Sequence, residues 1–202
     1  MSAAFTVNQS TVVVAAAANQ TLPTQESDGT NIVYYNVTIS NTGNSTVTSG
    51  TAGTFTVSNA LQIDADGELA VDAPYDNDGT LTMVGNAILH IRQQITDDAS
   101  ELGTAVVAGS GTIAYEDDAS QTVFTRINAT TAFSYFNLLI DNSGAAVASV
   151  EAATTCDVDG TLTIYDSDAD FTSTSGNLKI GGGFANYGPF TPNSGTVTVD
   201  GP

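Results

Sequence analysis

Val33-Tyr-Tyr-Asn-Val-Thr-Ile-Ser-Asn-Thr-Gly43 is the most informative stretch of this sequence, because it occurs a second time as Ser134-Tyr-Phe-Asn-Leu-Leu-Ile-Asp-Asn-Ser-Gly144. Both copies are rich in aromatic and branched apolar residues, which favour strands. Both end in Asn-x-Gly, which is typical of a turn. Tyr, Asn, Ile, Asn and Gly stand at the same places in the two copies. This recurrence indicates an internal structural repeat.

A shorter element, Asp-x-Asp-Gly followed by an alternating run, occurs three times in the chain. Its copies span residues 64–71, 76–83 and 157–164. Asp and Gly favour turns, and the Leu-x-Val, Leu-x-Met or Leu-x-Ile that follows places both apolar side chains on one face of a strand. Each copy therefore predicts a tight corner that leads into a strand.

Short alternating units of this kind fill most of the chain, and Gly, Asn, Asp and Ser separate them. Units so rich in Thr, Val and Ile predict an all-β protein. Their apolar residues recur about every six to nine residues, which is tighter than the roughly 8–12 residues between the turns of a sandwich. The spacing favours a β-solenoid, a parallel β-helix-like stack of short strands. A β-sandwich or jelly roll is the alternative.

One segment departs from the strand pattern. Between residues 87 and 102, Ile88, Ile91 and Ile95 are separated by three and four residues, which is helical spacing. Branched residues also form strands, so the segment is compatible with either structure.

The C-terminal part of the chain carries a family resemblance. Its motifs are Phe136-Asn-Leu-Leu-Ile-Asp-Asn-Ser-Gly144, Gly160-Thr-Leu-Thr-Ile164 and the Gly-, Asn- and Thr-rich stretch 181–201. They resemble a repeat of large bacterial surface and adhesin-like proteins, and similar repeats occur in phage fibre proteins. The resemblance covers residues 134–201 well and residues 33–83 loosely. It implies a right-handed parallel β-helix and no particular activity.

The repeats divide the chain into four segments. Residues 1–30 lie outside the repeat and are expected to be an N-terminal cap or an assembly arm. Residues 31–96 and 132–202 are expected to be the first and second β repeat units, with residues 97–131 as a connecting or inserted segment. A cap would fold back on its own coil, whereas an arm would use residues 1–20 to add a strand to a neighbouring subunit.

The net charge of −19, from 3 basic and 22 acidic residues, excludes several partners. Nucleic-acid binding needs a patch of Lys and Arg to neutralise phosphates, and Arg92, Arg126 and Lys179 are too few to form one. Anionic membrane surfaces are disfavoured for the same reason. No apolar run approaches the roughly 20 residues of a transmembrane helix, so we expect no membrane insertion.

The Asp-x-Asp-Gly corners resemble half of an oxygen-rich Ca²⁺ loop. Ca²⁺ takes roughly six to eight oxygen ligands, and closely spaced Asp residues at a Gly turn supply several. The candidate ligands are Asp64, Asp66, Asp76, Asp78, Asp157 and Asp159. Turn chemistry explains the same residues, since Asp-Gly is a common turn dipeptide. No cofactor is required, and Ca²⁺ is the one candidate.

Residues suited to catalysis are scarce. His90 is the one histidine and Cys156 the one cysteine, so a zinc site and a disulfide lack the residues they need. We expect Cys156 to be a small buried apolar residue. The pair Asp117-Asp118 and the acidic run 166–170 are the available carboxylates for glycoside hydrolysis. The absence of Trp and the 7% content of aromatic residues disfavour a carbohydrate cleft.

These features predict a non-enzymatic structural protein that assembles on a surface with copies of itself or with other structural subunits. A start without a basic leader favours the virion surface, where the chain would be a capsid decoration or fibre subunit. The alternative is an extracellular or cell-surface protein of bacteria or archaea, such as an adhesin or filament subunit. A β-helix that binds or cleaves a surface glycan is a third class.

Overall fold

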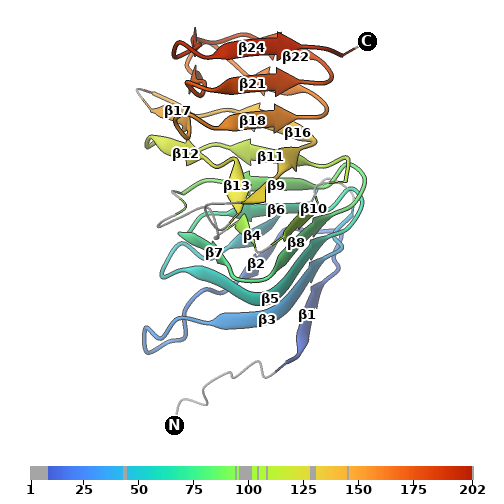
Figure 1. Ribbon diagram of the computed structural model, residues 1–202. Helices are drawn as coiled ribbons and strands as arrows, with labels where there is room; N and C mark the ends of the chain where they lie inside the picture. The colour runs from blue at the N-terminus through green and yellow to red at the C-terminus, as the bar shows by residue number, and fades with distance from the viewer. Residues whose placement is uncertain are drawn as a thin grey trace.

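In the computed structural model, the chain winds into successive coils whose strands pair in parallel (Figure 1). The coils rise from the N-terminal end at the bottom of the view to the C-terminal end at the top. The longest sheet has eight strands, one for each of about eight coils. The structure describes residues 9–42, 45–93, 95, 102–103, 105–107, 109–127, 131–144 and 146–201. The predicted all-β solenoid is confirmed, and the sandwich alternative is wrong.

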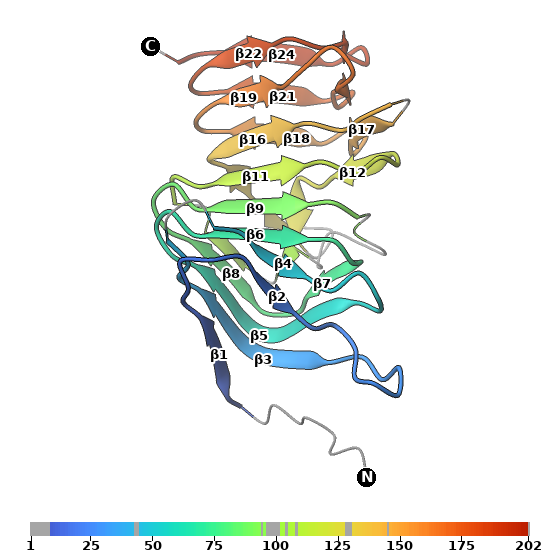
Figure 2. The ribbon, with the colours of Figure 1, turned by 180° about the vertical axis from the view of Figure 1, so that it is seen from behind.

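One sheet follows a single side of the stack along its whole length (Figure 2). Its eight strands are β2 (Gln20–Leu22), β4 (Val47–Ser49), β6 (Glu68–Val71), β9 (Ile88–Ile91), β11 (Thr112–Tyr115), β16 (Asn137–Ile140), β19 (Leu162–Ile164) and β22 (Phe184–Asn186). All pairings in this sheet are parallel.

The other sides of the stack are covered by shorter sheets. A six-stranded sheet in the N-terminal half contains β1 (Thr11–Val14), β3 (Val33–Ile39), β5 (Phe55–Ile63), β7 (Tyr75–Asn77), β8 (Thr80–Met83) and β10 (Ala105–Val107). Two four-stranded sheets in the C-terminal half contain β12 (Gln121–Val123), β17 (Val147–Val150), β20 (Asp170–Thr172) and β23 (Phe190–Thr191), and β15 (Ser134–Tyr135), β18 (Thr155–Val158), β21 (Asn177–Ile180) and β24 (Thr196–Val199). Among the described strands, the hairpin of β13 (Arg126–Ile127) and β14 (Thr131–Ala132) is the one antiparallel ladder.

Alternation along each strand fills the interior with columns of like residues. In the eight-stranded sheet, parallel register places five residues above one another, and all five are buried: Leu69, Leu89, Ile113, Leu138 and Leu162. A single coil cannot cover its own apolar side chains, so each coil relies on its neighbours for the roughly 25 cal/mol per Å² that apolar burial contributes. The core is therefore one continuous cluster along the stack.

The two copies of the internal repeat form the same local structure. Tyr34 and Tyr135 are both buried, and each hydroxyl donates a hydrogen bond to a backbone carbonyl eleven residues earlier (2.6 and 2.5 Å). Asn41 and Asn142 are also buried, and each side-chain amide donates to the backbone carbonyl four residues later. The repeat therefore specifies the shape of one corner of a coil.

The two copies occupy different sides of the stack. Residues 36–39 pair within the six-stranded sheet, whereas residues 137–140 pair within the eight-stranded sheet. The Asn36 side chain accepts a hydrogen bond from the Asn59 amide of the next coil (2.7 Å). Asn137 instead accepts one from the backbone amide of Thr161 (2.9 Å). The asparagines thus join adjacent coils and do not join the two copies of the repeat.

The helical spacing between residues 87 and 102 is misleading. Ile88–Ile91 form strand β9, in which Leu89 and Ile91 are buried, and Ile95 bridges in parallel to Tyr75. Pairing with the coils on either side satisfies the backbone here and suits branched side chains. Residues 94 and 96–101 of this segment lie outside the described residues.

The four segments expected from the repeats belong to one stack. Within the segment 97–131, β10, β11 and β12 pair with neighbouring coils as the other strands do. In the N-terminal segment, β1 pairs in parallel with β3, and β2 pairs with β4. These residues are therefore the first coil, while residues 1–8 of the expected arm lie outside the described residues.

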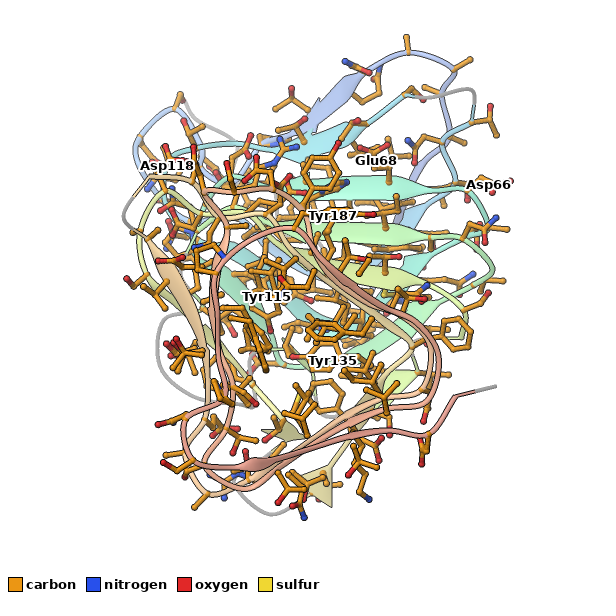
Figure 3. All side chains as sticks on the ribbon, turned by 90° about the horizontal axis from the view of Figure 1, so that it is seen from above. Asp66, Glu68, Tyr115, Asp118, Tyr135 and Tyr187 are labelled. Atoms are coloured by element: carbon orange, nitrogen blue, oxygen red, sulfur yellow. The ribbon has the colours of Figure 1, made fainter. Side chains whose placement is uncertain are left out.

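Two tyrosines in the core provide a test of this packing. Figure 3 shows Tyr115 and Tyr135 inside the coils, and their hydroxyl oxygens lie 3.0 Å apart. Since the Tyr135 hydroxyl also donates to the Phe124 carbonyl, Tyr135→Phe removes two buried hydrogen bonds. We expect this change to lower the free energy of unfolding, measured by urea denaturation, by about 1–2 kcal/mol.

Tyr75→Phe is the matched control for this variant. Within the described residues, the buried Tyr75 hydroxyl makes no hydrogen bond of good geometry, and the nearby Asn77 amide is bonded to Leu102 and Gly79 instead. Removal of the Tyr75 hydroxyl leaves no partner unsatisfied there, so this variant should be at least as stable as the wild type. Equal losses of stability in the two variants would contradict the assigned hydrogen bonds.

Candidate functional site

The Asp-x-Asp-Gly elements lie at separate corners of the stack. The six candidate ligands fall into three pairs: Asp64 and Asp66 after β5, Asp76 and Asp78 at the end of β7, and Asp157 and Asp159 at the end of β18. Within the described parts of the chain, no three His, Cys, Asp or Glu side chains are grouped so as to hold a metal ion. Ca²⁺ binding at these corners stays a prediction.

The carboxylates of these corners have different surroundings. The Asp64 carboxylate accepts hydrogen bonds from the Ser40 hydroxyl and the Gln62 amide, which lower its pKa. At Asp76, burial and then the charge of Asp78 raise the pKa. The copies of the element therefore do not share one arrangement of carboxylates.

The glycine of each element explains why the element recurs. A Cβ atom at Gly67, Gly79 or Gly160 would lie 3.0, 2.0 or 2.6 Å, respectively, from a backbone carbonyl oxygen of the preceding coil. None of the three has a positive φ, so backbone conformation does not demand glycine there. Glycine is needed because one coil passes close to the next and leaves no room for a side chain.

We expect Gly79→Ala to lower the free energy of unfolding by about 1–3 kcal/mol, because the new methyl group forces two coils apart. Thermal and urea denaturation would measure the loss. Gly183→Ala is the matched control, since a Cβ there meets its nearest neighbour at 3.4 Å, an ordinary contact. A control variant as unstable as Gly79→Ala would show that close approach is not the reason for the glycine.

His90 is surrounded by acidic side chains of the neighbouring coils. Its Nδ1 lies 2.5 Å from Oε1 of Glu116, and its Nε2 lies 3.1 Å from Oε1 of Glu68. Arg92 extends the cluster, with Nε 2.9 Å from Oε2 of Glu116 and Nη1 3.6 Å from Oδ1 of Asp72. The sequence presents His90 as isolated, because its partners lie one coil earlier and one coil later. The period of the coils is the one signal that could have paired them.

The charge of Glu116 makes the stability that this cluster contributes depend on pH. Burial raises the pKa of Glu116, but hydrogen bonds and charge from His90 and Arg92 outweigh it, so that its pKa lies below the usual value. A lowered carboxyl pKa stabilises the fold above the pKa of the unfolded chain, and this stabilisation is lost as pH falls through the folded-state pKa.

We expect Glu116→Gln to lower the free energy of unfolding by about 1–2 kcal/mol near neutral pH, because it removes a charge-assisted pair. The difference from wild type should close as pH falls through the folded-state pKa of Glu116, which lies below the usual value for Glu, because the wild-type carboxyl is then protonated. Urea denaturation across this range checks both statements, with Asp168→Asn at an exposed corner as the control. A difference that does not change with pH would contradict the role of the Glu116 charge.

The outward positions of the eight-stranded sheet form three columns of side chains. The first contains Glu68, Ile88, Thr112, Asn137 and Thr161, the middle one contains Ala70, His90, Ala114, Leu139 and Thr163, and the third contains Asp72, Arg92, Glu116, Asp141, Tyr165 and Tyr187. Figure 3, which looks along the stack, shows Glu68 and Tyr187 on the same side and Asp66 and Asp118 at corners. The third column thus changes from charged to aromatic toward the C-terminal end.

A shallow depression of about 450 Å³ lies on this face. It extends between the first two columns from Ile88 to Thr163, and Tyr165 lies at its edge. Beside it, burial and then the charges of Glu116 and Asp166 raise the pKa of Asp141. Sequence reasoning missed this depression, because its residues come from four coils.

The remaining candidate residues lie apart from this face. Cys156 is buried as expected, and burial raises the pKa of its thiol to about 12. Asp117 is buried and accepts a hydrogen bond from the backbone of its own turn, whereas Asp118 is exposed and accepts one from a serine. Asp166 and Asp168 are exposed at a corner.

Comparison with protein-family models, with curated proteins and with solved structures finds no match to this chain. The resemblance to surface and fibre repeats is therefore supported for the β-helical fold alone. Among the residues that the structure describes, no helix is long and apolar enough to cross a membrane.

Proposed function

We propose that this chain is a non-enzymatic structural subunit that self-assembles or decorates a larger particle, with contacts at the exposed edges of the described stack. The observation that carries this proposal is the exposure of two valines in β24, the outermost strand of its sheet among the described residues. Val197 and Val199 in β24 are 36% and 54% exposed, whereas their register partners in the coil below, Leu178 and Ile180, are completely buried. One further coil would bury the two valines as they themselves bury the residues below.

The N-terminal end offers a matching surface. Val12 and Val14 in β1 are half-buried, while their register partners Val37 and Ile39 are almost completely buried. The outer edges of β1 and β2 have no strand beside them among the described residues, which leaves backbone groups for pairing. Since all coils wind in the same sense, the first coil of one copy has the strand direction needed to continue the last coil of another.

Charge favours contact at the ends over contact along the sides. A net charge of −19 makes parallel rods repel one another, and the repulsion is screened by salt. Association at the ends removes apolar side-chain surface from water, which is favourable. We therefore expect rods to grow along the axis of the stack, and to do so more readily at higher ionic strength.

The proposed setting is a virion surface, where the subunit would be a decoration or part of a fibre. The alternative is the surface of a bacterial or archaeal cell, where it would belong to an adhesin or filament. In either setting the partners are other structural subunits, with the first coil as one half of the contact. Nucleic acid and membrane are not among the proposed partners, because the chain has 3 basic residues.

Sedimentation and negative-stain electron microscopy test the proposal. We expect the wild type to form end-to-end rods, and the double variant Val197→Asp/Val199→Asp to remain monomeric, with a lower melting temperature because the two valines also cover Leu178 and Ile180. Val84→Asp, at an exposed valine in the middle of the stack, is the matched control and should still assemble. A wild type that stays monomeric at all salt concentrations, or a double variant that assembles normally, would refute the proposal.

A further inference from the structure

We propose that the outer face of the eight-stranded sheet binds a neutral hexopyranose oligosaccharide, with Tyr165 and Tyr187 as its stacking platform. This site lies on the side of the stack and does not depend on assembly at the ends. The proposal rests on three properties of the face, namely exposed aromatic rings, a mostly apolar depression that carries threonine hydroxyls, and the sign of the surrounding charge.

The exposed rings are the first property. Tyr165 and Tyr187 are 59% and 69% exposed, while the other large rings of the described core, such as Tyr115 and Phe171, are buried. The Tyr187 amide donates to the Ile164 carbonyl (3.0 Å), so the two tyrosines follow each other in one column, about 4.8 Å apart along the stack. Two exposed rings that follow each other one coil apart suit the apolar C–H face of a pyranose, with the phenol hydroxyls left for hydrogen bonds.

The depression beside Tyr165 is the second property. Its volume of about 450 Å³ lies within the range of ligand sites in proteins. Most of its lining is apolar and includes Ile88 and Leu139, and the side chains of Thr112, Thr161 and Thr163 add hydroxyl groups. An apolar surface with hydroxyls beside it matches the C–H face and the O–H groups of a sugar ring.

Charge is the third property, and it selects among saccharides. Glu116 and Asp141 continue the tyrosine column, and Asp166 follows Tyr165 directly. The pKa of Asp141 is raised, first by burial and then by the charges of Glu116 and Asp166. Glu116 is paired with His90 and Arg92, so the carboxylates left to meet a ligand are those of Asp141 and Asp166, which accept hydrogen bonds from sugar hydroxyls but repel uronic acids and sulfated sugars. The face therefore fits neutral saccharides and excludes anionic ones.

Isothermal titration of the full chain with cellotetraose, maltotetraose, N-acetylchitotetraose and tetragalacturonate tests the proposal. We expect at least one of the three neutral tetrasaccharides to bind with a Kd of about 1 mM or tighter, and tetragalacturonate not to bind. The double variant Tyr165→Ala/Tyr187→Ala should lose at least about tenfold in affinity, whereas Tyr165→Phe, which keeps the ring, should retain most of it. Both tyrosines are exposed, so the melting temperature should not change.

Tyr35→Ala is the matched control, because Tyr35 is a partly exposed tyrosine of β3, which belongs to the six-stranded sheet. It should leave the affinity unchanged. The proposal is overturned if no neutral tetrasaccharide binds at millimolar concentration, if tetragalacturonate binds as well as they do, or if the control loses as much affinity as the double variant. The end variant Val197→Asp/Val199→Asp should lose assembly and keep saccharide binding, so that failure of one proposal is distinguishable from failure of the other.

Discussion

Backbone pairing between parallel coils is the constraint on which the rest of this structure depends. Neighbouring strands lie about 4.8 Å apart, so every residue is stacked on its counterparts in the coils above and below. Apolar residues then form columns such as the one from Leu69 to Leu162, and corners must pass close to the previous coil. Where a corner passes closest, as at Gly79, any side chain would strike a backbone carbonyl.

The same stacking brings charges together on the outside. In a chain with 22 acidic residues, columns of carboxylates would repel one another across adjacent strands. Arg92 interrupts such a contact, since it lies between Asp72 and Glu116, while Arg126 pairs with Glu151 at 3.1 Å. His90 lies between Glu68 and Glu116 in the same way. Arg92 and His90 are thus placed where the stack would otherwise set carboxylate against carboxylate.

A solenoid has two kinds of surface, and the two proposals assign a different role to each. The ends expose edges and half-covered core residues such as Val199, which suit pairing with another coil. The sides repeat one row per coil, so that a change along the chain, from Arg92 to Tyr165 in one column, becomes a gradient of chemistry along the rod. Assembly at the ends leaves the sides open for a ligand.

The sequence by itself determined the class of fold and the shape of its corners. Period-two alternation, the Asp-x-Asp-Gly elements and the paired copies beginning at Val33 and Ser134 depend on neighbours within one strand and turn, which sequence spacing records directly. The same local information left residues 88–91 open between helix and strand, because spacings of three and four residues also occur in strands of branched residues. Only the tertiary structure decided which side chains meet, such as His90 with Glu68 and Glu116, and which follow one another in a column, such as Tyr165 and Tyr187. The physical reason is that these partners are one coil apart, and the length of a coil depends on how each corner packs against the coil beneath it.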